Sequence, residues 1–428
     1  MPRIYTNYQP NSQRISRPKT ILVLPKMEKY PIFIYYPAKN KNSLNALIGA
    51  LQNHLLWNQL QFFFAQKEDD LLYLLAHSQR GLLLVSVMTP DSEQIRSLLI
   101  RCKSINSQVK ICLGGPHISA CPESFQELAD WLVRGEAENI ISEIISYAKD
   151  DFHFVNPMIL KSNHRVILDL YSPSPIKLGI YGFIEITRGC PYGCYFCQTS
   201  MIFGTDIRHR HLEAIFDYCR EMKKKDLNDI RFITPNALAY GSVDGRSINL
   251  NSLYSLLEGI KKIIGERGRI FFGSFPSEIR PEFITLESIQ LLKEFSNSKI
   301  LVLGAQTGSN RLLKTLHRGH TREQVFSAVD LAIQNGFQVA VDFIFGLPGE
   351  NEDDEKETVQ TINKLLKQGV KIHAHSFLPL PGTHFSSAQP SPISPFLRRF
   401  LGRIARDGFL FGQWQTQEKI AQTIKKKY

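Results

Sequence analysis

Three cysteines in one short loop are the residues whose types and spacing most clearly allow chemistry. Cys190, Cys194 and Cys197 are separated by three and then two residues. Pro191 and Gly193 allow the loop to curl, so that the thiolates can converge on one metal centre. Thiolates bind iron–sulfur clusters, and three of them leave one iron of a four-iron cluster open. The alternative is a structural zinc knuckle, but zinc takes a fourth ligand and the chain has no second C-x2-C pair.

A predicted strand at residues 183–187 leads into this loop, and five more strand-like segments follow, separated by helical patterns. The later segments are residues 230–234, 270–274, 300–305, 338–345 and 371–377. Strands that alternate with helices along a chain form parallel sheets. Six such units predict a partial (β/α)6 TIM-like barrel over residues 179–385. The cysteine loop would lie at the C-terminal end of its first strand, where barrels carry their chemistry.

A separate alternating series precedes the barrel. Its strand-like segments are residues 21–24, 60–65, 82–88, 109–113 and 131–134, with helices at 91–103 and up to Tyr147. The apolar run 82–88 is typical of a strand buried on both faces. The α/β pattern over residues 21–150 predicts a doubly wound Rossmann-like domain. Residues 1–20 are predicted to be a disordered lead-in, with a transit peptide as the alternative, residues 151–178 a linker and residues 386–428 a basic C-terminal extension.

The 428 residues carry a formal net charge of +11, which raises the question of a nucleic-acid partner. Residues 1–20 contribute +4 and residues 390–428 contribute +6, so the body between them is nearly neutral and nucleic acid is not expected. No apolar run reaches the ~20 residues that span a bilayer, and the N-terminus lacks a secretory pattern, so a cytoplasmic protein is expected. The seven cysteines are few and odd in number, which argues against a disulfide framework.

The segment from Thr187 to Cys197, TRGCPYGCYFC, resembles the signature of the radical S-adenosylmethionine (SAM) superfamily. The resemblance implies that the three cysteines hold a [4Fe–4S] cluster whose open iron chelates the methionine part of SAM. Reductive cleavage of SAM would then give a 5′-deoxyadenosyl radical, with a one-electron reductant such as flavodoxin or ferredoxin as partner. Phe196, just before the third cysteine, is expected beside the adenine.

Later strand ends are also similar to motifs of this superfamily. They are residues 273–281 (GSFPSEIRP), 304–309 (GAQTGS), 317–321 (HRGHT), 342–350 (DFIFGLPGE) and 379–383 (PLPGT). The second strand departs from the pattern, because it ends in residues 234–237 (TPNA) where many relatives have Gly-Gly-Glu. The resemblance implies SAM contacts from Phe196, Asn236, Ser274, Ser277, Glu278, Arg280, Gln306, Ile344 and Gly346.

Two glycine-rich turns follow strands of the N-terminal domain, residues 114–117 (GGPH) and 135–138 (GEAE). They resemble the cobalamin-binding domain of cobalamin-dependent radical SAM enzymes. The implied cobalamin contacts are Ser86, Gly114, Gly115, His117, Gly135 and Glu136. No Asp-x-His-x-x-Gly motif is present, so cobalamin would bind without a protein histidine on cobalt. Two alternatives remain: the domain has lost the cofactor, or His117 is a capping or hydrogen-bonding histidine.

The remaining cysteines and the tail have simpler interpretations. Cys102, Cys112 and Cys219 are expected to be small buried residues, and Cys121 is a spare thiol near the N-terminal turns. Apolar residues at 396, 397, 400, 401 and 404 predict a helix that packs over the barrel, with peripheral membrane contact as the alternative. Residues 413–428 are predicted to be a frayed, solvated end.

Taken with the resemblance, these features lead to one main functional hypothesis. It is cobalamin-dependent methyl transfer to an unactivated carbon of an unknown substrate, a small molecule or a peptide. The alternatives are a radical SAM rearrangement, cyclisation or methylthiolation without methyl transfer from cobalamin. A non-catalytic protein that senses cobalamin or SAM is a further alternative.

Overall fold

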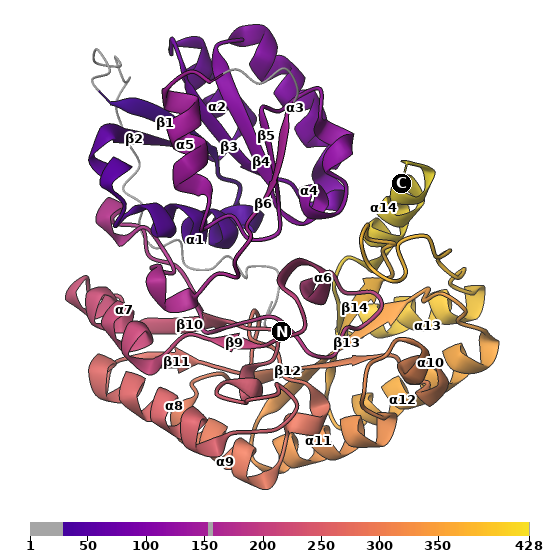
Figure 1. The fold of residues 1–428 in the computed structure, drawn as a ribbon. Helices are drawn as coiled ribbons and strands as arrows, with labels where there is room; N and C mark the ends of the chain where they lie inside the picture. Colours follow the sequence, from indigo (N-terminus) through magenta and orange to yellow (C-terminus); the bar gives the residue numbers. More distant parts are fainter. Residues whose placement is uncertain (1–28, 153–156, 428) are drawn as a thin grey trace.

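A computed structural model describes residues 29–152 and 157–427 and shows an N-terminal domain, a partial barrel and two C-terminal helices (Figure 1). The predicted lead-in 1–20 and the predicted strand 21–24 lie outside the described residues. In Figure 1 the N-terminal domain lies above the barrel, and the C-terminal helix α14 (Trp414–Lys427) rises beside both.

The N-terminal domain is a six-stranded parallel sheet with the order β2-β1-β3-β4-β5-β6. The strands are β1 (Tyr30–Tyr35), β2 (Leu60–Ala65), β3 (Gly81–Ser86), β4 (Val109–Gly114), β5 (Trp131–Arg134) and β6 (Met158–Lys161). Every residue of β1 and β3 is buried, as expected for strands covered on both faces. The strand order reverses between β1 and β3, and such a switch point is where doubly wound sheets bind ligands.

Helices cover both faces of this sheet, which confirms the doubly wound prediction. They are α1 (Lys41–Leu51), α2 (Glu68–Ala76), α3 (Ser92–Ile105), the short α4 (Pro116–Ala120) and α5 (Ile141–Lys149). One apolar core contains residues of α2 and α3, and a second contains residues of α1 and α5.

Strand β6 was not expected, because it lies in the predicted linker 151–178. It pairs in parallel with β5 and alternates between half-buried and exposed residues. Met158 and Leu160 pack against the core shared by α1 and α5, whereas Ile159 is 44% exposed. The apolar run of this edge strand, residues 158–160, is only three residues long, which is too short to identify a strand by its pattern.

The second domain is the predicted partial barrel, built from seven parallel strands in two sheets. One sheet contains β7 (Ile184–Glu185), β10 (Asp229–Ile233) and β11 (Arg269–Phe271). The other contains β12 (Ile300–Gln306), β13 (Gln338–Phe345), β14 (Lys371–Ser376) and the additional strand β15 (Leu410–Phe411). An isolated bridge between Ile279 and Leu303 joins the segment after β11 to β12 of the other sheet. The six predicted strands are therefore all present.

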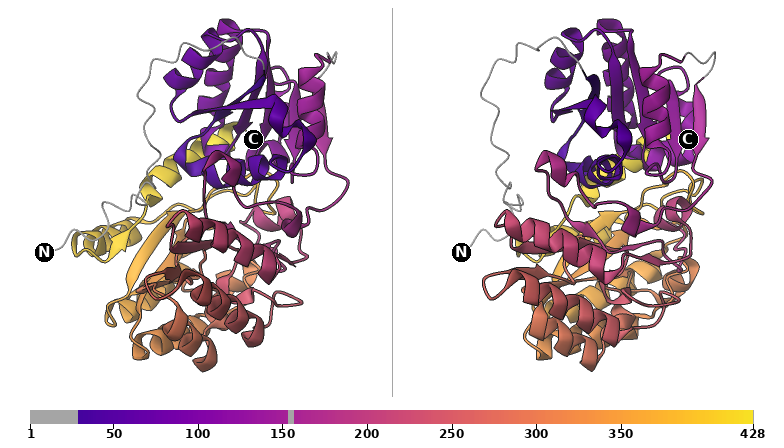
Figure 2. Two further views of the ribbon diagram at one scale, coloured as in Figure 1. Left: turned by 90° about the vertical axis from the view of Figure 1, so that its left-hand side faces the viewer. Right: turned by 60° about the vertical axis from the view of Figure 1, so that its left-hand side comes forward.

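Helices surround the outside of these strands (Figure 2). They are α7 (Leu212–Lys224), α8 (Leu250–Ile264), α9 (Leu286–Phe295), α10 (Asn310–Thr315), α11 (Arg322–Gln334) and α12 (Glu352–Leu366). The apolar faces of α7, α8, α9, α11 and α12 and the outward faces of the strands form one large core, whereas Leu312 of α10 belongs to a separate small cluster.

The C-terminal extension packs against the rest of the molecule. Helix α13 (Pro395–Arg406) buries its apolar stripe in the barrel core, at Leu397, Phe400, Leu401 and Ile404. The predicted packing over the barrel is thus confirmed. The predicted frayed end is wrong, because α14 runs from Trp414 to Lys427, buries Trp414 and Ala421, and contacts β14 and residues 89–91 of the N-terminal domain.

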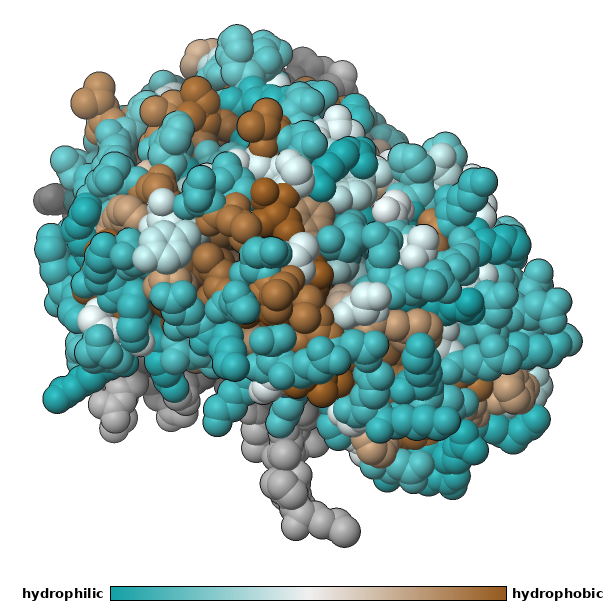
Figure 3. Space-filling model, turned by 90° about the horizontal axis from the view of Figure 1, so that it is seen from below, coloured by the Kyte–Doolittle hydropathy of each residue, from teal (hydrophilic) through white to brown (hydrophobic). Residues whose placement is uncertain are grey.

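The face of the molecule seen from below is mostly hydrophilic, with a central band of hydrophobic residues and smaller hydrophobic groups around it (Figure 3). No helix in the part of the chain that the structure describes is long and apolar enough to cross a membrane.

Candidate functional site

The cysteine loop begins directly after β8 (Thr187–Arg188), which pairs antiparallel with β9 (Arg208–His209). Gly189 has φ +90°, and a Cβ there would lie 2.2 Å from the Asp206 carbonyl oxygen, so only glycine fits. The Cys197 amide donates to the Cys194 carbonyl at 2.9 Å, which closes a tight turn. Gly189 and this turn curl the loop locally between Thr187 and Cys197.

The three thiols form one electrostatic group. Burial raises the pKa of Cys190, and charge on Cys194 and Cys197 raises it further. Nη1 of Arg318 lies 3.6 Å from the Cys194 Sγ, and the Thr199 amide donates to the Cys197 Sγ at 3.5 Å. A guanidinium and an N–H beside thiolates are the surroundings that a thiolate-bound cluster needs.

The spacing of the sulfurs disfavours the zinc alternative. In the described part of the chain, Asp342, His373 and His375 bring three possible ligand atoms within 4.8 Å of one another. The three cysteines do not form such a group. Thiolates on one tetrahedral zinc ion would lie only about 3.8 Å apart. In a four-iron cluster each thiolate binds a different iron, so wider spacing fits.

An aromatic–cation stack fixes the cysteine loop to the barrel. The Tyr192 ring lies 3.3 Å from the Arg280 guanidinium and 4.8 Å from that of Arg246. Arg280 also donates to Glu282 and to the Arg318 carbonyl. The structure therefore places Arg280, expected at SAM, in a buried clamp that supports the cysteine loop.

Two further expected SAM residues hold their own turn. Ser277 is buried and its hydroxyl donates to the Ser274 carbonyl at 2.9 Å. The Ser274 hydroxyl lies 3.0 Å from that of Ser298. Both hydroxyls therefore have protein partners.

Asn236 has an amide group that fits a ligand. Its Oδ1 accepts from the Arg280 amide at 3.3 Å, but its buried Nδ2 has no hydrogen-bond partner. A buried N–H without a partner is costly, so it suits an acceptor supplied from outside. Because the group is a donor, it fits a carboxylate or hydroxyl oxygen of SAM and not its amino nitrogen.

Glu278, Gln306, Ile344 and Gly346 come from three neighbouring strand ends. Burial and the charge of Asp342 raise the pKa of Glu278 to about 7. Gln306 has φ +75° at an irregularity in the β12–β13 register, and Ile344 is half-buried on β13. The Gly346 amide donates to Glu350 Oε2 at 2.7 Å, which fixes the turn that the resemblance puts at the adenine.

Phe196 packs against two apolar clusters. It touches the main barrel core and the small cluster of Leu312, Leu316, Leu347 and Phe377. It therefore lies close to the turn after β13, as a residue beside the adenine would.

A cavity of about 380 Å³ lies between the N-terminal domain and the barrel. On the domain side it is lined by five of the six expected cobalamin residues, Ser86, Gly114, Gly115, Gly135 and Glu136. On the other side it is lined mainly by apolar residues, among them Phe183, Ile202, Phe203 and Ile233. It opens at the switch point between β1 and β3, as expected for a doubly wound sheet.

The cavity edge has features that fit a large ligand. Gly115 has φ +94°, and a Cβ there would lie 2.7 Å from the Ser86 Oγ and 2.8 Å from the Val87 amide nitrogen. Asn40 donates to the Ser86 carbonyl at 2.6 Å, while its buried Oδ1 has no partner. A glycine that lets the backbone approach and an unpartnered acceptor are what a polar cofactor edge would use.

His117 is the expected cobalamin residue that does not line the cavity. It is fully buried, with Nδ1 3.2 Å from the Thr89 Oγ1 and Nε2 3.1 Å from the Ser124 Oγ. Burial lowers its pKa to about 4. These contacts favour the alternative of a hydrogen-bonding histidine.

A buried ion-pair network was not found from the sequence. Arg188, two residues before Cys190, pairs with Glu136 at 2.7 Å, Glu138 at 2.7 Å and Glu185 at 2.6 Å. Arg208 also pairs with Glu136, at 2.9 Å. Glu136 and Glu138 belong to the N-terminal domain, so this network joins the cavity edge to the cysteine loop.

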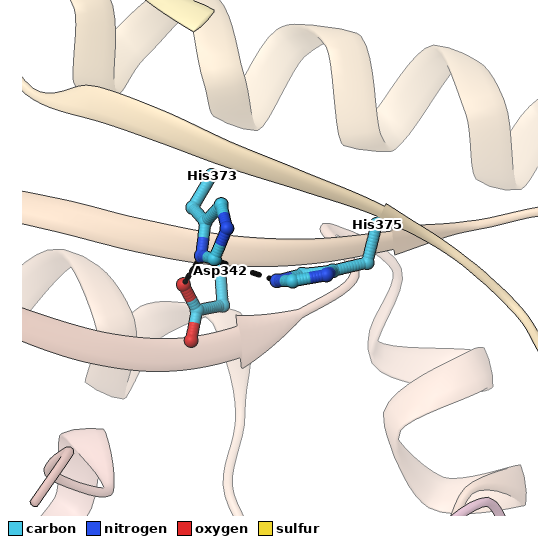
Figure 4. Close-up of side chains that lie close together, drawn as sticks. All are labelled: Asp342, His373 and His375. Carbon is cyan, nitrogen blue, oxygen red and sulfur yellow. Dashed lines mark hydrogen bonds and ion pairs between the residues drawn. The ribbon is translucent and has the colours of Figure 1, made fainter. Parts of the chain in front are cut away.

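A second group that the sequence analysis did not find lies in the barrel. Asp342 on β13 and His373 and His375 on β14 have ligand atoms within 4.8 Å of one another (Figure 4). The H-x-H spacing, which places both imidazoles on one face of a strand, was the signal available in the sequence.

The remaining cysteines lie outside the cysteine loop, although Cys112 also lines the interdomain cavity. Cys102, Cys112 and Cys219 are buried, and burial raises the pKa of each to about 12, which confirms the prediction. Cys102 belongs to the core under α2 and α3, whereas Cys112 belongs to the core on the opposite face of the sheet.

Two protein-family models match the chain. The model of the radical SAM superfamily matches residues 184–362, and that of the B12 binding domain matches residues 42–145. Among curated proteins, a tRNA-2-methylthio-N(6)-dimethylallyladenosine synthase of Thermotoga petrophila is 29% identical over 207 residues, covering 47% of this chain and 44% of the synthase. The chain spans about half the length of the curated methylthiotransferase relatives that it matches.

Solved structures share the fold. The radical S-adenosylmethionine methyltransferase TsrM of Kitasatospora setae, with cobalamin and a [4Fe–4S] cluster bound, has a TM-score of 0.63 at 14% identity. The match covers 84% of this chain and 77% of TsrM. The cobalamin-dependent radical enzyme OxsB, with aqua-cobalamin and SAM bound, has a TM-score of 0.61 at 16% identity, covering 90% of this chain and 56% of OxsB. The chain therefore contains a radical SAM domain, which is preceded by a B12-binding domain.

Proposed function

We propose that this chain is a cobalamin-dependent radical SAM methyltransferase that acts on an unactivated carbon. One observation carries the proposal: the cavity at the expected cobalamin edge is bounded by both domains, and Arg188 joins that edge to the cysteine loop. Two cofactors that must act on one substrate need such fixed proximity. We further propose that a flavodoxin or ferredoxin donates the electron and that the substrate is a small molecule or a peptide. The protein would act in the cytoplasm.

The chain's own residues would bind and orient the reacting groups. Cys190, Cys194 and Cys197 would hold the cluster, and Asn236 would donate to an oxygen of SAM. When bound, the cluster supplies the electron that cleaves SAM, and cobalamin supplies the methyl group. The apolar wall of the cavity would exclude water and thereby protect a radical from side reactions.

Methylthiolation is the second candidate, because curated relatives include a methylthio-adenosine synthase. That reaction is associated in the family with three upstream cysteines and a second cluster. Here Cys102 and Cys112 lie in cores on opposite faces of the N-terminal sheet. They cannot reach one cluster without unfolding the domain, which favours methyl transfer.

Anaerobic turnover would test the proposal. The full chain, loaded with iron, sulfide and cobalamin, is mixed with SAM, a reductant and a metabolite extract, and its products are quantified. We expect both 5′-deoxyadenosine and S-adenosylhomocysteine. 5′-Deoxyadenosine without S-adenosylhomocysteine would contradict methyl transfer and would favour a rearrangement, a cyclisation or another radical reaction. The absence of both products despite an intact cluster would favour a non-catalytic sensor.

A further inference from the structure

Asp342, His373 and His375 project from one face of two paired strands. Asp342 is the register partner of His373, and His375 lies two residues further along β14. Their neighbours on the opposite face, Val341 and Phe343, are buried in the core that contains residues of α12. Because side chains alternate between the faces of a strand, the three polar residues face the barrel interior. Their side chains point toward one another (Figure 4).

One atom, His373 Nδ1, faces both of the other groups. It lies 2.9 Å from the Asp342 Oδ1 and 3.1 Å from the His375 Nε2. A ring nitrogen offers either one N–H or one lone pair, so a single proton at Nδ1 cannot point well at both neighbours. A cation between the three atoms would instead receive a lone pair from each.

The distances fit adjacent ligand positions around a metal ion. Ligand bonds of about 2.1 Å at right angles would place neighbouring ligand atoms about 3.0 Å apart. Two imidazoles and one carboxylate on one face form the arrangement that binds divalent first-row transition ions and leaves other positions open. We propose that Asp342, His373 and His375 bind a divalent transition metal ion, zinc or ferrous iron, inside the barrel.

Neighbouring side chains would orient these ligands. The His373 ring stacks on Phe411, with ring centres 4.5 Å apart. The Gln417 amide lies 3.3 Å from the His375 Nδ1, and its oxygen accepts from the Ser376 amide at 2.9 Å. A His375 that binds a metal through Nε2 carries its proton on Nδ1, so the Gln417 amide would have to flip to present its oxygen there. Outer partners of this kind are typical of metal-bound histidines.

The site would share the barrel interior with the proposed SAM residues. Asp342 and His373 lie close enough to Glu278 for their charges to act on it, as does Arg318, which contacts Cys194. The open metal positions would therefore be available to an oxygen or nitrogen atom of a substrate held in the barrel. Metal binding itself does not depend on the proposed methyl transfer.

Zinc retention by the full chain would test the site without SAM or cobalamin. Cluster-loaded wild-type protein and the variants His373→Gln and His375→Gln receive Zn²⁺ alone, are dialysed, and are analysed for zinc by mass spectrometry. The matched control is His77→Gln, an exposed residue at the end of α2. We expect one retained zinc per chain in wild type and control, and at least tenfold weaker retention in both variants. A parallel Fe²⁺ arm, read by Mössbauer spectroscopy beside the cluster iron, identifies the preferred ion.

X-ray absorption at the zinc edge identifies the atoms around zinc in the wild-type protein, so the test does not depend on the folding of a variant. Wild-type zinc should show only nitrogen and oxygen neighbours, with the scattering pattern of imidazole. No retained zinc or ferrous iron in wild type would overturn the proposal. Sulfur neighbours, or variants that retain zinc as well as His77→Gln does, would also overturn it. None of these results would change the expected products of SAM turnover.

Discussion

Arg188 Nη1 donates to Glu136 Oε1 across 2.7 Å, and this bond joins the barrel to the N-terminal domain. Glu136 lines the interdomain cavity, and Arg188 lies two residues before the first cluster cysteine. Both side chains are less than one-tenth exposed. A buried, charge-assisted bond between rigid elements holds position better than a flexible surface pair. It thereby sets where the cavity lies relative to the cysteine loop.

Replacing Arg188 by methionine should strongly destabilise the protein. The change leaves Glu136, Glu138 and Glu185 buried with fewer charge partners, which typically costs about 3–5 kcal/mol. The exposed pair of Arg220 and Asp217 on α7 supplies the matched control, for which Arg220→Met should cost less than about 1 kcal/mol. Urea denaturation of both variants measures the difference, and equal losses would refute the structural role of Arg188.

The adjacent glycines of the cavity edge should respond differently to an added methyl group. Gly115→Ala places a Cβ against Ser86 and Val87 at φ +94° and should cost about 1–3 kcal/mol. Gly114→Ala has its nearest neighbour at 3.9 Å, the Val133 carbonyl oxygen, and should cost less. Thermal unfolding without cobalamin measures the loss of stability in each variant. The same measurement with cobalamin shows whether the variant still gains stability from the cofactor. An equal cost at the two positions would contradict this account of the edge.

Arg318→Met should make the cluster harder to reduce. The guanidinium lies 3.6 Å from the Cys194 Sγ, and a nearby positive charge favours the more negative, reduced cluster. The midpoint potential should therefore fall, on the order of tens of millivolts. Potentiometric titration followed by electron paramagnetic resonance measures it, with Arg220→Met as the control. An unchanged or raised potential would mean that Arg318 does not act on the cluster.

His117 should make stability sensitive to acid. Burial lowers its pKa in the folded chain to about 4, below the ordinary value of 6.5, so the folded chain binds fewer protons than the unfolded chain. Its contribution is fully present above pH 6.5 and is lost as the pH falls towards 4. The loss amounts to about 3 kcal/mol.

The variant His117→Gln should lack this acid-dependent loss. The difference in stability between wild type and variant should therefore shrink from pH 7 to pH 4, as followed by urea denaturation at each pH. Cobalamin affinity at pH 7.5 should change little, because His117 does not line the cavity. A large loss of affinity in a fully folded variant would restore His117 as a cobalamin contact.

The sequence predicted the parts that depend on local patterns. The cysteine loop, the strand-end turns and most of the buried parallel strands have signals within a few residues of one another, but the buried strand β1 was missed despite its local apolar run. The other features that the sequence missed depend on distant partners. Arg188 meets Glu136 from 52 positions away, and Asp342 meets His373 only through the β13–β14 register.

Local composition also misled at two elements. The polar and lysine-rich sequence of α14 hides the spaced apolar residues Trp414 and Ala421 that bury it. His117 follows a glycine turn typical of a ligand edge, but the short helix α4 directs its ring toward Thr89 and Ser124 inside the domain. The sequence alone could not decide between these two directions of the side chain.

The most direct test of the central claim is the cofactor content of one anaerobic preparation of the full chain. Iron, acid-labile sulfide and corrin are measured together in wild type, Cys194→Ala and Gly115→Val. We predict a full [4Fe–4S] complement and one cobalamin per chain in wild type. Cys194→Ala should lose the cluster and keep cobalamin, and Gly115→Val should show the reverse. A wild-type protein that takes up the cluster but no cobalamin would contradict the account.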